Sequence, residues 1–194
     1  REKTFTRLPV KVPGAFGSTV GLISLGMIGK RMVELLKPFD IKVIAYDPYV
    51  ADYPGVTMVP LDEIFRRADV ISVHTPWMEE TEGLITGAHL SSMKPYSTFI
   101  NTSRGAVIRE EEMIAVLQQR PDLTAVIDVT HPEPPAPESP LYTLPNVILT
   151  PHIAGSVDEE CRRQGQTMIA ELRRYLAGEP LLYQLTKEQI KTMA

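Results

Sequence analysis

The stretch Val20-Gly21-Leu22-Ile23-Ser24-Leu25-Gly26-Met27-Ile28-Gly29 decides the fold of this chain. Its first half is a short and mostly apolar run, which is typical of a β-strand buried on both faces. The glycines that follow predict a tight turn. Beyond Gly29, apolar residues recur at helical spacing as far as Leu36, and Pro38 then stops the helix.

The same alternation of strand and helix continues along the chain. Apolar runs predict strands at 20–25, 42–46, 70–73, 98–101, 124–127 and 147–149. Helical patterns lie between Gly29 and Pro38, at 61–67, around 87–93, at 109–119 and at about 158–176, where Gly178 ends the last helix. Strands and helices that alternate over short connections predict an α/β fold, a Rossmann-type doubly wound parallel sheet.

Polar residues follow almost every predicted strand. In a doubly wound sheet, ligands bind beyond the carboxyl ends of the strands, at the point where the strand order reverses. A ligand site should therefore place polar residues directly after strands. The segments that do so are Ser24–Gly29, Asp47-Pro48, His74-Thr75-Pro76, Asn101–Gly105, Asp128 and Thr150-Pro151-His152.

The glycine turn and Asp47 together indicate a dinucleotide site. A pyrophosphate needs close approach of the backbone, which Gly26 allows, and tight packing of helix on strand, which Gly29 allows. Ser24 occupies the first glycine position of the usual fingerprint, so the turn alone also fits a generic strand–helix connection. Asp47 ends the next strand, where an acid accepts hydrogen bonds from the adenosine ribose and repels a 2′-phosphate. The combination favours NAD over NADP, although Asp47 by itself could be a turn residue before Pro48.

Arg104, Glu133 and His152 are the residues that we predict to be catalytic. Reduction of a 2-oxo acid needs a cation for the carboxylate, and an arginine offers a matching planar fork. It also needs an acid to protonate the carbonyl oxygen, and a histidine can carry that proton near neutral pH, helped by a nearby carboxylate. Spacing alone cannot pair Glu133 with His152, and each also fits a surface or structural role.

These motifs resemble the D-isomer-specific 2-hydroxyacid dehydrogenases over about residues 17–180. The likeness lies in the turn at 20–29, in Ile100-Asn101-Thr102-Ser103-Arg104-Gly105, in Ile127-Asp128-Val129-Thr130-His131-Pro132-Glu133-Pro134 and in Leu144–Gly155. It implies that Arg104 binds substrate, that Glu133 and His152 are catalytic, and that Asp128 contacts the nicotinamide amide. Met27 stands where a basic residue is frequent in the family, and His131 is interpreted as a surface residue. The predicted cofactor-binding residues are Gly26, Met27, Ile28, Gly29, Asp47, His74, Pro76, Thr81, Thr102, Ser103, Asp128, His152 and Gly155.

The resemblance also predicts how the chain is organised. Members of the family carry a second, substrate-binding domain. We expect residues 1–16 to be a lead-in from that domain, 17–178 the NAD-binding domain and 179–194 a tail that returns to it. A 194-residue piece of this kind should bind NAD but turn over 2-oxo acids poorly. The family also implies a homodimer and a small 2-hydroxy or 2-oxo acid substrate, of glyoxylate, hydroxypyruvate or phosphoglycerate type.

Composition narrows the alternatives. The net charge of −4 argues mildly against nucleic-acid binding, and no apolar run is long enough to predict a membrane span. The lone Cys161 predicts neither a disulfide nor a metal site, which suits a cytoplasmic protein. An NAD-binding regulatory or corepressor-like protein of the same fold stays an alternative. An L-type lactate or malate dehydrogenase does not account for the Asn-Thr-Ser-Arg-Gly segment.

Overall fold

The computed structural model describes residues 14–190. Most of the expected lead-in, residues 1–13, and the last four residues of the tail lie outside the described residues. The elements, in chain order, are β1 (Thr19–Ile23), α1 (Met27–Leu36), β2 (Lys42–Tyr46), β3 (Thr57–Met58), α2 (Leu61–Arg67), β4 (Val70–Val73), α3 (Gly87–Ser91), β5 (Thr98–Asn101), the 3-10 helix η1 (Gly105–Val107), α4 (Glu110–Gln119), β6 (Thr124–Ile127), the 3-10 helix η2 (Pro140–Tyr142), β7 (Val147–Leu149), α5 (Glu159–Ala177) and α6 (Lys187–Ile190).

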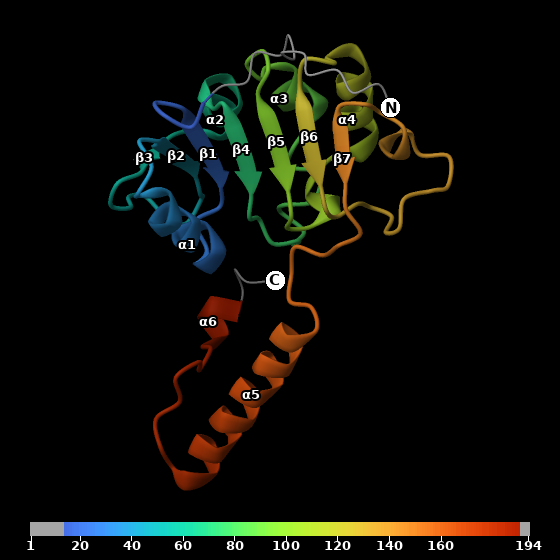
Figure 1. The fold of residues 1–194 in the computed structure, drawn as a ribbon. Helices are drawn as coiled ribbons and strands as arrows, with labels where there is room; N and C mark the ends of the chain where they lie inside the picture. The colour runs from blue at the N-terminus through green and yellow to red at the C-terminus, as the bar shows by residue number, and fades with distance from the viewer. Residues whose placement is uncertain (1–13, 191–194) are drawn as a thin grey trace, which may run out of the picture.

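The strands form one parallel sheet in the order β3-β2-β1-β4-β5-β6-β7, which confirms the predicted fold class (Figure 1). Strand order reverses at β1, which pairs with β2 on one side and with β4 on the other. Because all seven strands run in the same direction, their carboxyl ends meet at one edge. The fold therefore predicts a ligand crevice beside β1 at that edge.

Helices cover the two faces of the sheet unequally. The larger apolar cluster joins α2, α3 and α4 to one face and includes Phe65, Phe99 and Met113. Gly21 of β1 lets α2 pack closely, since a Cβ atom there would lie 2.7 Å from the Ile64 side chain. A smaller cluster joins α1 to the opposite face of β1 and β2.

On the α1 side, the described residues leave part of the sheet uncovered. Leu22, Ser72, Ile100, Val126 and Ile148 are paired in one row from β1 to β7. Leu22 beneath α1 is fully buried, Ile100 and Val126 are half-buried, and Ile148 is 53% exposed. The apolar face of β5, β6 and β7 is therefore available for further packing.

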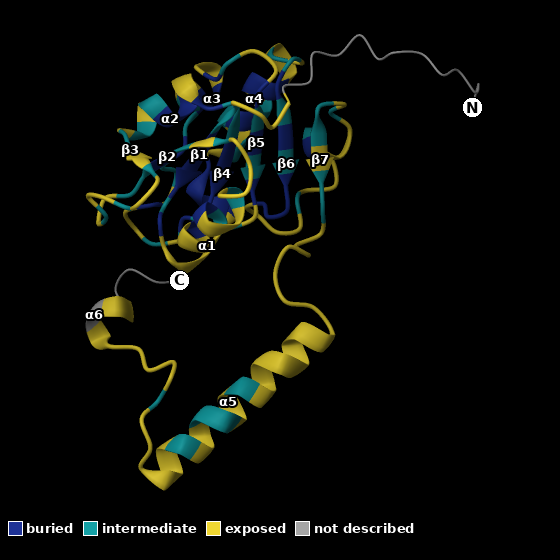
Figure 2. Cartoon of the chain, turned by 60° about the vertical axis from the view of Figure 1, so that its left-hand side comes forward, coloured by how far each residue is buried: buried dark blue, intermediate teal, exposed yellow. Residues whose placement is uncertain are grey.

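Helix α5 extends away from the sheet and has no buried residue (Figure 2). The sequence predicts this helix and its end at Gly178, which adopts φ +67° as a left-handed cap. Its apolar stripe stays exposed at Met168, Leu172, Tyr175 and Leu176. No helix of the described chain is long and apolar enough to span a membrane.

The tail folds back along α5 and is held there by Glu171. One carboxylate oxygen of Glu171 accepts the backbone N–H groups of Leu182 and Tyr183 at 2.9 and 3.0 Å, and the other binds Arg174. Further along, Thr186 and Gln189 exchange side-chain-to-backbone hydrogen bonds. This exchange is a capping box at the start of α6.

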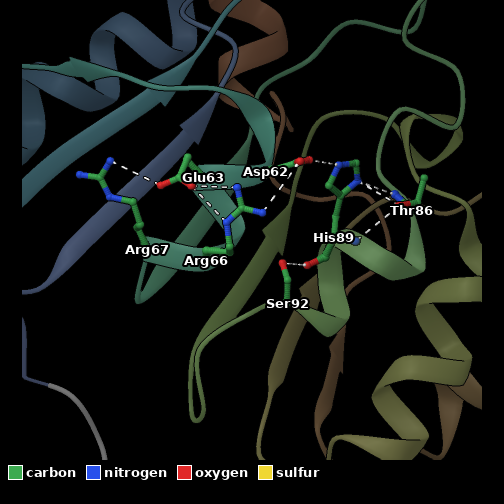
Figure 3. Close-up of polar contacts among 7 residues, drawn as sticks. All are labelled: Asp62, Glu63, Arg66, Arg67, Thr86, His89 and Ser92. Carbon is green, nitrogen blue, oxygen red and sulfur yellow. Dashed lines mark hydrogen bonds and ion pairs between the residues drawn. The ribbon is translucent and has the colours of Figure 1, made fainter.

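A polar cluster fastens α2 to α3 on the covered face (Figure 3). The His89 Nδ1 accepts the backbone N–H of Thr86 at 3.1 Å, and Nε2 lies 3.1 Å from an Asp62 carboxylate oxygen. Because Nδ1 accepts a hydrogen bond here, Nε2 is the nitrogen that carries the hydrogen and donates to Asp62. The ring also stacks on Phe65, with centroids 4.9 Å apart. His89 therefore caps α3 and joins it to α2.

Candidate active site

The glycine turn at the end of β1 contains a serine in a glycine conformation. Ser24 has φ +79°, which ends the strand at Ile23, two residues before its expected end. Its hydroxyl lies 3.0 Å from that of Thr75 in the loop after β4. Gly29 is needed for packing, because a Cβ atom there would lie 2.3 Å from the Ser24 carbonyl oxygen.

Helix α1 begins at this turn with an open amino end. Gly26 is its N-cap, no side chain caps the helix, and a Cβ atom at Gly26 would meet no atom within 4 Å. Met27 and Ile28 in the first turn are exposed, at 74% and 66%. Uncapped backbone N–H groups and open space at a helix N-terminus fit the phosphates of a dinucleotide.

Asp47, directly after β2, is already hydrogen-bonded to the backbone. One carboxylate oxygen accepts the N–H of Leu25 at 2.7 Å, and the other accepts those of Tyr49 and Val50 at 2.7 and 3.1 Å. These bonds join the β2 loop to the glycine turn. If Asp47 binds the adenosine ribose as expected, it would accept the ribose hydroxyls with the lone pairs that these backbone bonds leave free.

A cavity of about 390 Å³ lies between the turn, Asp47 and the loop after β4. It brings together five of the predicted cofactor residues: Gly26, Asp47, His74, Pro76 and Thr81. Its other lining residues, which the sequence did not assign, are Ser24, Leu25, Lys30, Tyr46, Pro48, Tyr49, Val50, Thr75, Met78, Glu80 and Leu84.

Two side chains in the β4 loop are occupied by local bonds. The Thr81 hydroxyl donates to the Pro76 carbonyl at 2.6 Å and accepts the Met78 N–H at 2.8 Å, so it shapes the loop. His74 pairs with the Ser72 hydroxyl at 3.1 Å. Burial lowers the pKa of His74 below its ordinary value, which keeps the imidazole neutral near neutral pH.

The segment after β5 is held by the buried Asn101. Its side chain accepts the N–H and hydroxyl of Ser103 and donates to the Arg104 carbonyl. The Arg104 guanidinium is exposed and donates to the Ser103 carbonyl at 2.7 Å. Thr102, like Ser103, follows the strand without lining either cavity.

Asp128, at the end of β6, fastens the segment that carries His152. Its carboxylate accepts the Thr150 hydroxyl at 2.5 Å and the N–H groups of Ile153 and Ala154, both at 2.9 Å. Burial acts to raise the pKa of Asp128, but these hydrogen bonds and the nearby His152 lower it below its ordinary value. Gly155, just beyond, has open space around it.

His152 and Glu133, which sequence spacing could not pair, are in direct contact. Nδ1 of His152 lies 2.6 Å from a Glu133 carboxylate oxygen. His152 adopts φ +53°, a left-handed conformation that few non-glycine residues adopt. A second cavity, of about 800 Å³, opens beside the pair and is lined by both residues and by Asp128. Within the described chain, no hydrogen bond or ion pair joins Arg104 to this pair.

Two contacts that the sequence does not predict fix the loop before Glu133. A carboxylate oxygen of Glu110 in α4 accepts the His131 N–H at 3.0 Å, and the exposed His131 ring meets Trp77 edge-on at 5.2 Å. A Cβ atom at Gly105 would lie 2.1 Å from the Thr130 carbonyl carbon, so only glycine fits there. The loops after β4, β5 and β6 are thus packed together.

Comparison with known proteins assigns this arrangement to a family. Residues 1–154 match the model of the NAD-binding domain of D-isomer specific 2-hydroxyacid dehydrogenases. The chain belongs to this family. The resemblance seen in the motifs is thereby confirmed, and the match ends just after the His152 segment.

Individual relatives agree with the family assignment. The chain is 41% identical to a putative 2-hydroxyacid dehydrogenase, YoaD, of Bacillus subtilis over 145 residues, which is 74% of this chain and 42% of the relative. It is 37% identical to D-3-phosphoglycerate dehydrogenase of Mycobacterium tuberculosis over 183 residues, 92% of this chain and 34% of the relative. The chain thus spans less than half the length of these relatives.

A solved structure of the family has the same fold. The D-isomer specific 2-hydroxyacid dehydrogenase of Xanthobacter autotrophicus Py2, in complex with NADPH and MES, superposes with a TM-score of 0.79 at 28% identity. The superposition covers 94% of this chain and 77% of that one. A nicotinamide dinucleotide is therefore the cofactor class of this domain.

Proposed function

We propose that this domain serves an NAD-dependent oxidoreductase that transfers a hydride between NAD(H) and a D-2-hydroxy acid or its 2-oxo partner. The observation that carries the proposal is the 2.6 Å contact between His152 Nδ1 and the Glu133 carboxylate at the carboxyl edge of the sheet. A bound nicotinamide would supply or accept the hydride. The chain's own residues would then manage the proton and the substrate carboxylate.

His152 is the proposed proton donor in reduction and the general base in oxidation. When its Nδ1–H donates to Glu133, the tautomer is fixed and Nε2 faces away as the atom that exchanges a proton with substrate. Asp128 holds the neighbouring backbone of Thr150, Ile153 and Ala154. Glu133 and Asp128 therefore orient one imidazole from two sides.

Arg104 is the proposed substrate-carboxylate ligand. It follows β5, which lies next to β6 in the sheet, and its guanidinium is exposed. A turn of this side chain away from the Ser103 carbonyl would free a planar fork of donors for a carboxylate. Asn101 fixes the backbone from which that turn starts.

NAD is the proposed cofactor in preference to NADP. Three backbone hydrogen bonds fix the Asp47 side chain at the rim of the 390 Å³ cavity, and Glu80 adds a second acidic group. A 2′-phosphate placed there would meet like charge at short range. The Xanthobacter relative was solved with NADPH, so the proposed preference rests on this chain's own Asp47 and Glu80.

The substrate is proposed as a small 2-oxo acid of glyoxylate, hydroxypyruvate or phosphoglycerate type. Because the chain spans 34% to 42% of the two relatives, we propose that a separate substrate domain completes recognition. The exposed stripe of α5 and the open face of β5–β7 are surfaces that such a domain could cover. The 194-residue chain alone should then bind NADH and turn over 2-oxo acids poorly.

The test is oxidation of NADH by the full-length protein with a panel of 2-oxo acids. His152→Ala should lower turnover by about 10²- to 10⁴-fold, because it removes the general acid, with little change in NADH affinity. Glu138→Ala is the control, since Glu138 is exposed in the loop after Glu133 and lines neither cavity, and it should leave turnover nearly unchanged. Unchanged turnover in His152→Ala would mean that another residue supplies the proton. NADH binding without turnover of any 2-oxo acid would favour the regulatory alternative.

A further inference from the structure

Lys30 occupies an unexplained position in the cofactor cavity. It is the fourth residue of α1, three positions beyond Met27, and it lines the 390 Å³ cavity together with Gly26 and Asp47. Its side chain is exposed and forms no ion pair within the described part of the chain. A free ammonium on a cavity wall is a group whose role the fold does not account for.

The geometry of α1 aims this side chain at the open helix end. Residues three apart lie on the same helix face, so Lys30 stands directly above Met27. The Cα–Cβ bonds of a helix tilt toward its N-terminus, which leans the long lysine stem toward Gly26. Met27 itself offers no charge and is 74% exposed.

In the structure, the ammonium rests against a ring that does not line the cavity. The Lys30 Nζ lies 5.8 Å from the centroid of the Tyr53 ring, in the connection between β2 and β3. The side chain therefore extends from α1 across to the β2 side of the turn. Cation–π contacts at exposed sites are weak, about 0.5–1 kcal/mol, so an anion in the cavity could draw the ammonium away from Tyr53.

The charge balance of the cavity calls for such a cation. The cavity wall holds two carboxylates, Asp47 and Glu80, and its other ionisable basic group, His74, is kept neutral by burial. The pyrophosphate of a dinucleotide brings two more negative charges to the same space. Lys30 is the lysine or arginine on this wall that can offset them.

We propose that Lys30 binds the pyrophosphate of the dinucleotide and replaces the basic side chain missing at Met27. This inference rests on the proposed function and names one residue of its cofactor site. Lys30 would leave Tyr53 when the cofactor enters and add its charge to that of the uncapped N–H groups of α1. It would then recover part of the affinity that the imperfect glycine turn loses.

The test is the affinity of the 194-residue chain for NADH, followed by energy transfer from its one tryptophan. Lys30→Met should weaken NADH binding about three- to tenfold, the range for one partly exposed charge contact. The loss should shrink in about 1 M salt, where the screening length falls to roughly 3 Å. Lys30→Met, Met27→Arg should restore the affinity, because the cation returns one turn earlier on the same face.

Lys37→Met is the matched control. It makes the same charge change at the far end of α1, where the side chain is exposed and does not line the cavity, and it should leave NADH affinity unchanged. Equal affinity of Lys30→Met and the unsubstituted chain would overturn this inference alone. A loss confined to NADPH would overturn it in favour of a 2′-phosphate contact. Failure of the unsubstituted chain to bind NADH would overturn both this inference and the proposed function.

Discussion

At the scale of single residues, the candidate site depends on side chains that hold backbone as much as on side chains that face a ligand. Asp47 holds the β2 loop to the glycine turn, Thr81 shapes the β4 loop and Asp128 fixes the His152 segment. Each was predicted as a cofactor contact. The structure shows that each positions its own loop, so a substitution would have a structural effect in addition to any effect on the proposed cofactor binding.

Asp128→Asn tests this dual role. An amide keeps the size of the side chain but can accept at one atom only, so at least one of the Thr150, Ile153 and Ala154 donors loses its partner. We expect the free energy of unfolding near neutral pH to fall by about 1–3 kcal/mol. Urea denaturation measures this value. Asp52→Asn, an exposed position, should change it by less than about 0.5 kcal/mol.

The free energy of unfolding at acid pH should also depend on Asp128. The pKa of Asp128 is lowered in the folded chain. Its charge therefore contributes to the free energy of unfolding above the unfolded-state pKa of about 3.9, and this contribution is lost as pH falls through the folded-state pKa. The stability difference between the unsubstituted chain and Asp128→Asn should therefore narrow below about pH 4. A difference that stays constant into this range would show that the Asp128 charge is not the stabilising feature. Burial acts to raise the pKa of Asp69, but hydrogen bonds from Lys94 and Thr19 lower it below its ordinary value. Asp69 should therefore keep some dependence of stability on acid pH in both proteins.

At the scale of elements, periodicity located the sheet well. The expected strands at 42–46, 70–73, 98–101, 124–127 and 147–149 coincide with β2, β4, β5, β6 and β7. The two-residue β3 was missed, because two residues carry no period. The predicted first strand ends two residues too late, at Leu25 rather than Ile23. Nothing in the sequence reveals that Ser24 leaves the strand with φ +79°.

Contacts between loops were beyond the reach of periodicity. The pairing of Glu133 with His152 and of His131 with Trp77 joins residues that are far apart in sequence and carry no spacing signal. Strand ends were a better guide, since they predicted which segments gather at the carboxyl edge. Which side chains touch there depends on the packing of each loop.

The α2–α3 junction offers a test at this scale. His89→Ala removes the acceptor for the Thr86 N–H, the Asp62 partner and the stack on Phe65. We expect a loss of about 1–3 kcal/mol in unfolding free energy, combining a lost helix cap with a lost ring contact. Denaturant titration provides the measurement. A loss no larger than that of Glu138→Ala, at an exposed loop position, would mean that His89 contributes little to holding the two helices.

The α5 tail gives a second test of an element. Glu171→Ala should release the N–H groups of Leu182 and Tyr183 from their shared acceptor. Hydrogen exchange at these two amides should become faster, while the sheet amides stay protected. Glu159→Ala, on the exposed first turn of α5, is the control. Unchanged exchange at the two amides would show that the tail is held by other contacts.

At the scale of the whole molecule, the described chain combines a well-packed sheet edge with surfaces that lack a partner. The cavities and loops of the candidate site lie at the carboxyl edge, whereas the face of β5–β7 and the stripe of α5 stay open. The homodimer implied by the family stays a prediction, and the mass of the full-length protein in solution would test it. We propose that cofactor binding, in contrast, needs only the elements that this chain contains.

The most direct test of the account is therefore a calorimetric titration of the 194-residue chain with NADH and with NADPH. The fixed carboxylate of Asp47 and the uncapped amino end of α1 predict one saturable NADH site per chain. NADPH should bind at least about tenfold more weakly, a difference of about 1.4 kcal/mol. Absence of saturable NADH binding, or tighter binding of NADPH, would contradict the account.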